Sequence, residues 1–188
     1  MLSYLYLQNN LIEEIPVLQI PSLRKLYLDD NRIQVVSGLQ NCIALEELQL
    51  ARQKLPTFTS IQFDPQTLHA ISFNLQVLEI SSCGVSILTI FSRMLNLRKL
   101  FCKDNLVTDI DEVASVMRLP ILEEANFLGN PCCKMFKYRD IAIGESSDAL
   151  QILDEVPIPR HQLVAIKGLM IDRYNKGLIS KFDPARFD

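Results

Sequence analysis

One eleven-residue frame constrains the fold of this chain more than any other feature of its sequence. The segment from Leu23 to Ile33, LRKLYLDDNRI, fits the pattern LxxLxLxxNxI. Leu26 and Leu28 alternate with more polar neighbours, which is the period-2 pattern of a short strand with one buried face. Asn31 follows three residues after Leu28. The frame therefore predicts a short strand that ends in a sharp turn.

The same frame recurs through most of the chain, and its copies start 21 to 30 residues apart. Self-similarity with this period is the signature of a leucine-rich repeat, in which each repeat adds one strand to a growing stack. We therefore predict an α/β fold: a right-handed solenoid with a parallel concave sheet of about six strands, a short helical or irregular convex side and a C-terminal helical cap. The copies are 2–12, 23–33, 45–55, 75–85, 97–107 and a degraded copy at 122–130.

The repeat pattern divides the chain into three predicted regions. An insertion at 56–70 separates the third and fourth copies. Within it, Asp64 followed by Pro65 is a helix-start signal, so we expect a helix from Pro65 to Phe73 and a rim loop from Thr57 to Gln62. The regions are leucine-rich repeats at 1–130, a cap at 131–158, and an amphipathic helix with an extended tail at 159–188.

The first copy has no capping unit before it in this sequence. A terminal repeat lacks one of its two neighbours, so its inward-facing Leu5 and Leu7 would meet no further layer. Its strand would also be an unpaired edge. We expect either that another chain covers this end or that the sequence is a shortened form of a longer chain.

The asparagine position of each copy is predicted to be structural. A buried amide there can bond the backbone groups of the turn that water cannot reach. Gln53 is one methylene longer and Cys83 offers one weak donor, so the third and fourth turns are predicted to be the least regular. The predicted ladder consists of Asn10, Asn31, Gln53, Cys83, Asn105 and Asn130.

The sequence carries little chemistry typical of an enzyme. His69 and His161 fall on different predicted elements, and neither has a serine or cysteine beside it in a nucleophile motif. With six glycines there is no glycine-rich phosphate loop, and the five cysteines lack metal-ligand spacing. We predict no catalytic residue, no cofactor and no metal, and we interpret the cysteines as buried free thiols.

Net charge and hydropathy limit the classes of partner that the chain is expected to bind. The net charge is −3, and its uneven distribution is too weak to form the basic surface that binds nucleic acid. No membrane span or secretory signal is visible. We therefore expect no nucleic-acid and no membrane partner.

The concave side of the predicted sheet is the candidate binding surface. Residues beside and between the strand leucines point to that side. Exposed aromatic residues on a rigid surface are typical of binding hot spots, although a few surface aromatics are normal on any protein. The candidate residues are Tyr4, Tyr6, Lys25, Tyr27, Glu47, Gln49, Val77, Glu79, Lys99, Phe101 and Asn126.

The spacing of the copies and the cap sequence, GNP then YRD then LQILD, resemble the leucine-rich-repeat regulatory subunits of protein phosphatase 1. LYLQNN, FDPQTLH and GNPCCKMFKYRD resemble members associated with microtubules and their organising centres. The resemblance covers about residues 1–156 and implies the phosphatase catalytic subunit, tubulin or a microtubule-associated protein as partner. It implies a place in the cytoplasm, at the cytoskeleton, centrosome or cilium. The chain departs from the family in lacking earlier repeats and a phosphatase-docking [Arg/Lys]-Val-x-Phe peptide.

Several functions fit these observations. The leading hypothesis is a non-catalytic protein-binding scaffold, either a phosphatase regulatory subunit or an adaptor on microtubules or cilia. A permanent structural component of an axonemal assembly is the alternative. A ribonucleoprotein repeat protein is less favoured, because it would need a basic concave surface and this one is mixed.

Overall fold

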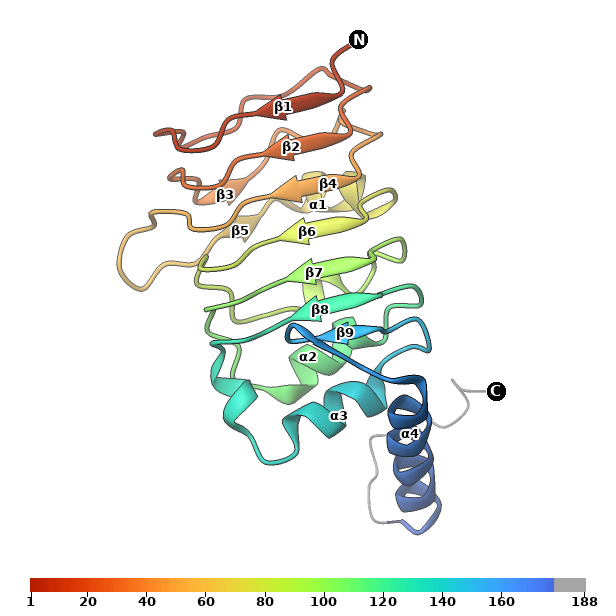
Figure 1. Ribbon diagram of the computed structural model, residues 1–188. Coiled ribbons are helices and arrows are strands. Elements are labelled where there is room, and N and C mark those ends of the chain that lie inside the picture. Colours follow the sequence, from red (N-terminus) through yellow and green to blue (C-terminus); the bar gives the residue numbers. More distant parts are fainter. Residues whose placement is uncertain (178–188) are drawn as a thin grey trace.

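A computed structural model describes residues 1–177 of the 188. Its main feature is an eight-stranded sheet, which Figure 1 shows as a stack running from the N-terminus towards the C-terminal helices. All neighbouring strands pair in parallel except the last two, which are antiparallel. In stacking order the strands are β1 (Tyr4–Tyr6), β2 (Lys25–Tyr27), β4 (Glu47–Gln49), β6 (Val77–Glu79), β7 (Lys99–Phe101), β8 (Glu124–Asn126), β9 (Ile152–Leu153) and β10 (Val156–Pro157).

The predicted fold class is confirmed, because each repeat contributes one strand in the predicted register. Leu26 pairs with Leu48, Leu48 with Leu78, and Leu78 with Leu100, so one column of leucines runs through the stack. These four side chains are completely buried. The hydrophobic core is thus a continuous column that each repeat extends by one layer.

The sheet is longer than the six strands predicted, because the cap adds two more. Ala125 pairs with Leu153 of β9, and Leu153 is fully buried as the next layer of the column. Asp154 follows it and accepts a hydrogen bond from the Phe127 N–H at 2.8 Å. The segment LQILD therefore supplies another strand as well as covering the core. The division at residue 130 stays a prediction, since the sheet continues across it.

The asparagine ladder holds neighbouring repeats together through their backbones. The Asn31 amide donates to Leu28 O and Leu7 O, both at 2.9 Å, and its oxygen accepts from Ile12 N–H at 3.0 Å. Gln53 repeats this arrangement one layer on, donating to Leu28 O. Each amide thus satisfies carbonyls of its own repeat and of the preceding one.

The prediction that the third and fourth turns are the least regular is wrong for their φ values but is confirmed by one backbone hydrogen bond. Arg52 and Ser82 have φ values of 56° and 55°, beside 58° for Asp30 and 52° for Asp104 in the asparagine-bearing repeats. The longer Gln53 reaches the same carbonyls, and the Cys83 thiol donates to Leu50 O at 3.0 Å. A thiol lacks the amide oxygen that accepts the next N–H. That N–H belongs to Leu55 and bonds Gln53 O instead, where the insertion begins.

Helices and a small second sheet form the side behind the main sheet in Figure 1. The insertion helix α1 (Pro65–Ser72) ends one residue before its predicted end, and Asp64 caps it by accepting from the Thr67 N–H. A 3-10 turn (Thr89–Phe91) backs the fourth repeat, and α2 (Ile110–Met117) backs the fifth. The predicted rim loop ends early: Gln62 belongs to β5 (Gln62–Phe63), because its N–H bonds Gln34 O as β5 pairs with β3 (Val35–Val36).

Besides β9 and β10, the C-terminal cap contains a 3-10 turn (Pro131–Lys134) and α3 (Tyr138–Glu145), and α4 (Arg160–Asn175) follows it. α3 packs against α2, and α4 packs against α3 and projects beyond the stack in Figure 1. Of the predicted apolar face of α4, Leu163 is buried but Tyr174 is exposed. No described helix is both long and apolar enough to span a bilayer. The predicted tail 178–188 lies outside the described residues.

The leucine column generates a stability prediction. Leu26→Ala and Leu100→Ala should each lower the free energy of unfolding by about 2–5 kcal/mol, the range for emptying a buried leucine site. Urea denaturation followed by circular dichroism measures this. Leu106→Ala is the matched control, because Leu106 is 57% exposed and its loss should change stability by about 0.5 kcal/mol or less. Unchanged unfolding of both column variants would contradict the assignment.

The edge of the sheet generates a second prediction. β1 has one strand neighbour in the described structure, whereas β4 has two. In the isolated monomer, the amides of Leu5 and Leu7 should therefore exchange with deuterium faster than those of Leu48 and Leu50. Equal protection, in a sample shown to be monomeric by sedimentation, would contradict this. Equal protection in a larger assembly would indicate that another chain covers the edge.

Candidate functional site: the concave surface

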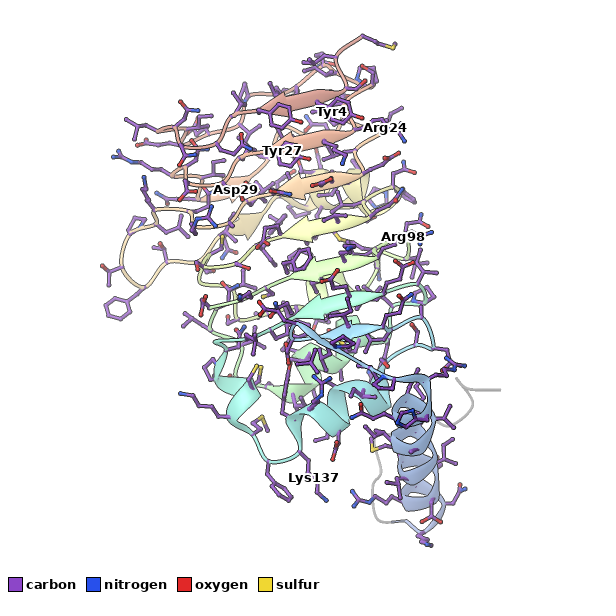
Figure 2. The ribbon with its side chains drawn as sticks, in the orientation of Figure 1. Tyr4, Arg24, Tyr27, Asp29, Arg98 and Lys137 are labelled. Carbon is purple, nitrogen blue, oxygen red and sulfur yellow. The ribbon has the colours of Figure 1, made fainter. Side chains whose placement is uncertain are left out.

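The candidate residues lie on the strand face turned away from α1 and α2, which we call the concave surface. Tyr4 and Tyr6 are its most exposed aromatic residues, at 48% and 64%. Figure 2 shows Tyr4, Tyr27 and Asp29 together on the first two strands. The parallel register places Tyr27 two strands from Glu79 and three from Phe101. The surface therefore combines residues from four repeats or more.

The prediction is wrong for one member of this surface, Asn126. Asn126 is 4% exposed, so it is buried. Its amide nitrogen donates to Glu155 at 3.1 Å and its oxygen accepts from the Leu128 N–H. Glu155 belongs to the turn between β9 and β10, which the repeat pattern did not predict. The cap thus covers the last predicted position of the surface.

A stacked pair of tyrosines forms the N-terminal part of the surface. The rings of Tyr6 and Tyr27 lie 4.8 Å apart between centroids and are parallel to within 2°. This distance matches the spacing of neighbouring strands, so paired positions in a parallel sheet bring the rings face to face. Burial raises the pKa of Tyr27, and the negative charge of Glu47 adds to the rise. The pairing of β1 with β2 therefore holds the two rings in contact.

Ion pairs cross between neighbouring strands on the same face. Lys25 pairs with Glu47 at 2.8 Å and Lys99 with Glu124 at 2.7 Å, in each case between residues in register. Gln49 also donates to Glu47 at 2.7 Å. Although burial opposes the change, these hydrogen bonds lower the pKa of Glu47. Such exposed pairs contribute up to about 1 kcal/mol each, and here they favour the observed register.

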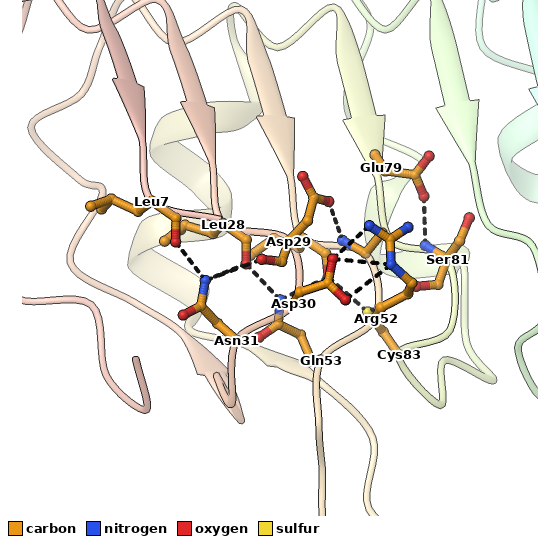
Figure 3. A network of polar contacts seen from close by, with 12 residues as sticks. Leu7, Leu28, Asp29, Asp30, Asn31, Arg52, Gln53, Glu79, Ser81 and Cys83 are labelled. Atoms are coloured by element: carbon orange, nitrogen blue, oxygen red, sulfur yellow. Dashed lines mark hydrogen bonds and ion pairs between the residues drawn. The ribbon is translucent and has the colours of Figure 1, made fainter. Parts of the chain in front are cut away.

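Two carboxylates of the surface are less well compensated. The Asp29 side chain is 7% exposed and accepts from the Ala51 N–H at 2.8 Å, while Glu79 accepts from the Ser81 N–H at 2.7 Å. Figure 3 shows both carboxylates close to Arg52, whose guanidinium is bonded to Asp30 at 2.7 Å. Burial raises the pKa of both carboxylates, and their mutual repulsion adds to the rise at Glu79.

Sequence reasoning selected Glu79 but did not include Asp29 among the candidate residues. The signal was available, because Asp29 lies two residues after Tyr27 and strand periodicity places both on one face. The burial of Asp29 was not visible in the sequence, since it depends on neighbouring repeats. Asp29 and Glu79 meet through the stacking of β2, β4 and β6.

Residues with catalytic or metal-binding chemistry are not brought together in the described part of the chain. His69 lies on α1 and His161 on α4. Burial raises the pKa of Cys83 and Cys102 to about 12, so both thiols are protonated at neutral pH. Across residues 1–177, no group of three or more His, Cys, Asp or Glu side chains is placed to hold a metal ion.

Comparison with known structures identifies the fold. No family model matches this sequence. The crystal structure of the Drosophila melanogaster SNF/U2A′ complex contains a chain that is 17% identical, with a TM-score of 0.55 over 93% of this chain and 85% of that one. An internalin from Listeria monocytogenes is also 17% identical, with a TM-score of 0.59 over 84% of this chain and 48% of its own. The chain has the leucine-rich-repeat fold. At this identity the likeness of these leucine-rich-repeat structures concerns the fold alone.

On this leucine-rich-repeat surface, Glu47 has an ion-pair partner, whereas Asp29 and Glu79 have none among residues 1–177. The two kinds of carboxylate predict opposite dependences of folding stability on pH. Because the pKa values of Asp29 and Glu79 are raised on folding, their contribution to stability is fully present below the ordinary values of 3.8 and 4.5 and is lost as pH rises through the folded values. The lowered pKa of Glu47 stabilises the fold above pH 4.5, and this is lost as pH falls. The change in unfolding free energy caused by Glu79→Gln should therefore be more favourable at pH 7 than at pH 4. The change caused by Glu47→Gln should be less favourable at pH 7 than at pH 4.

Urea unfolding of both variants and the unsubstituted chain, measured at pH 4 and pH 7, tests this. The two variants serve as controls for each other, since both convert a glutamate of the same sheet face to glutamine. The same sign of change in both variants would contradict the assignment of opposite pKa shifts.

Proposed function

We propose that this protein is a non-catalytic scaffold that binds a protein partner on its concave surface. The observation that carries the proposal is the stack of the exposed Tyr6 on the half-buried Tyr27, on strands whose backbones are held in register by the ladder. Tyrosine is enriched among the residues that dominate binding energy at protein interfaces. Solubility gives no reason to expose such a stack.

Rigidity supports the proposal. A flexible surface loses conformational freedom when it binds, at about 0.5–1.5 kcal/mol for each side chain that becomes ordered. Tyr27 is already held by its ring contact with Tyr6, and Lys25 and Lys99 are held by ion pairs. Binding on this face should therefore cost little ordering entropy.

For the partner, we extend the resemblance to protein phosphatase 1 regulatory subunits, and within them to regulatory subunit 42, the testis leucine-rich-repeat protein. The catalytic subunit of protein phosphatase 1, and tubulin or a microtubule-associated protein, are the first partners to test. The proposed location is the cytoplasm, at the cytoskeleton, centrosome or cilium. The mixed charge of the concave surface, with Lys25 and Lys99 both paired to glutamates, favours protein over nucleic acid.

A permanent structural role in an axonemal assembly is the second candidate. The observation that favours it is the first repeat, where Leu5, Leu7 and Ile12 are only partly buried against the core and β1 forms the edge of the sheet. An edge strand with apolar neighbours is a template for pairing with another chain. Such a contact would be made by the end of the stack and would leave the concave surface free.

The concave surface generates the central functional prediction. The double variant Tyr27→Ala, Phe101→Ala should lose partner binding, because central aromatic residues are worth about 2 kcal/mol or more each. Recovery of the partner from cell lysate by the purified chain, quantified by mass spectrometry, should fall at least about tenfold. Circular dichroism checks that the variant is folded.

The double variant Phe58→Ala, Phe73→Ala is the matched control. Both of its phenylalanines are exposed, at 103% and 58%, but Phe58 lies in the rim loop and Phe73 at the end of α1. The control should recover the partner normally. If the concave variant recovers the same proteins in the same amounts, the concave surface is not the site.

A further inference from the structure

The N-terminal half of the concave surface has an unusual distribution of charge. Asp29 at the end of β2 and Glu79 on β6 flank β4, and Figure 3 shows their carboxylates on the same side of the sheet. The strand between them carries Ala51, the in-row neighbour of Asp29, whose N–H binds the Asp29 carboxylate. Alanine has only a methyl group, so no longer side chain from this position separates the two acids. Two strand spacings, about 10 Å, separate the flanking strands.

The other charges of this half are neutralised within the protein. Lys25 pairs with Glu47, and Arg52 is bidentate on Asp30, with contacts at 2.7 and 3.1 Å. Within residues 1–177, no lysine or arginine nitrogen makes an ion pair with Asp29 or Glu79. Arg52 lowers the pKa of both groups, but burial outweighs it. In this part of the chain, Asp29 and Glu79 therefore lack an ion-pair partner of their own, although Arg52 lies near both (Figure 3).

An aromatic ring adjoins the same place. Tyr6 stacks on one face of Tyr27, and the sheet order places β4 on the opposite side of Tyr27. At the position next to Tyr27 on β4, Gln49 directs its amide to Glu47. A cation that lay over β4 would thus meet an aromatic ring and two carboxylates. Ring faces attract cations within about 6 Å, and desolvation strengthens the attraction.

We infer that the protein segment bound on the concave surface presents an arginine side chain, which lies over Ala51 against Tyr27 and pairs with the carboxylates of Asp29 and Glu79. This inference rests on the proposed function and names the chemistry of the partner. A guanidinium is planar, stacks on aromatic rings and has donors on several edges, so it can serve two separated carboxylates at once. A lysine ammonium is a compact, strongly hydrated charge that fits such a site less well.

The later repeats provide a contrast within the same sheet. The positions that correspond to Glu79 and Ser81 one repeat further on are Phe101 and Lys103, and Lys103 pairs with Glu155 at 2.7 Å. Lys99 pairs with Glu124. On this face the pair Asp29 and Glu79 therefore has no counterpart beside Phe101, and we expect the arginine to bind in the N-terminal half.

Two backbone amides report on this site directly. The Ala51 N–H donates to Asp29 and the Ser81 N–H to Glu79, so a cation that engages the carboxylates must shift both amide resonances. The probe is acetyl-Ala-Ala-Arg-Ala-Ala-amide, titrated into the uniformly nitrogen-15-labelled 188-residue chain. Saturable shifts of both amides are expected. The matched peptides carry citrulline, the neutral isostere of arginine, or lysine; citrulline should cause no such shift and lysine should bind several-fold more weakly.

Variants of the protein complete the test. Glu79→Gln and Asp29→Asn keep an oxygen for the Ser81 and Ala51 N–H groups but remove the charge, and each should weaken the arginine peptide about tenfold, as for the loss of one charge-assisted hydrogen bond. Glu124→Gln removes a carboxylate that is paired with Lys99 and should leave the affinity unchanged. Equal shifts with arginine and citrulline, equal affinity for arginine and lysine, or an unchanged affinity in Glu79→Gln would overturn the inference.

The same variants separate this inference from the proposed function. In the lysate experiment, Asp29→Asn, Glu79→Gln should lose the partner as Tyr27→Ala, Phe101→Ala does. If the carboxylate variant keeps the partner and the aromatic variant loses it, the concave surface is the site but arginine recognition is wrong. If both variants keep the partner, the proposed function itself fails.

Discussion

The amide ladder inside the turns is the interaction on which the rest of the structure depends. Each turn brings backbone carbonyls into the interior, where an unpaired polar group costs about 1–3 kcal/mol. Asn31 meets this cost by bonding Leu28 O and Leu7 O at once, and Gln53 does the same one layer on. Because each amide bonds two repeats, it also fixes how one repeat stacks on the next. Cys83 shows the limit of this arrangement: its thiol donates as the amides do, but it has no amide oxygen for the Leu55 N–H, which bonds Gln53 O instead.

Stacking in fixed register turns the concave face into a surface with defined chemistry. Parallel pairing sets Lys25 beside Glu47 and Lys99 beside Glu124, so one face carries two similar ion pairs at two places in the stack. The same register places the ring of Tyr6 on that of Tyr27. Neither arrangement requires a loop to become ordered. A surface of this kind suits binding by preformed contacts, in which the side chains hold their bound positions beforehand.

The carboxylates of Asp29 and Glu79 show how such a surface can favour a partner over the free state. Their burial without an ion-pair partner in the described chain opposes their charged forms, and removal of a charge there should stabilise the free protein at neutral pH. Binding residues commonly lower stability in this way, because a site arranged for a ligand is incomplete without it. Glu47 provides the comparison, since its charge is satisfied within the protein by Lys25 and Gln49.

Much of this protein was determined by its sequence alone, because the repeat is a local pattern. The spacing of Leu26, Leu28 and Asn31 specifies a strand and a turn, and its recurrence specifies a parallel stack, so the fold class and the six repeat strands were predictable. The helix start at Asp64 was equally local. Strand periodicity also placed the tyrosines on one face.

The tertiary structure decided what depends on distant segments of the chain. β9 and β10 join the sheet because Leu153 fits the next layer of the core, and the turn that follows buries Asn126 beneath Glu155. The proximity of Asp29 to Glu79, and their lack of an ion-pair partner among the described residues, arise when β4 places a small Ala51 between their strands. Burial and electrostatic compensation are properties of the assembled stack, since each depends on which side chains neighbouring repeats bring alongside, and no single repeat encodes them.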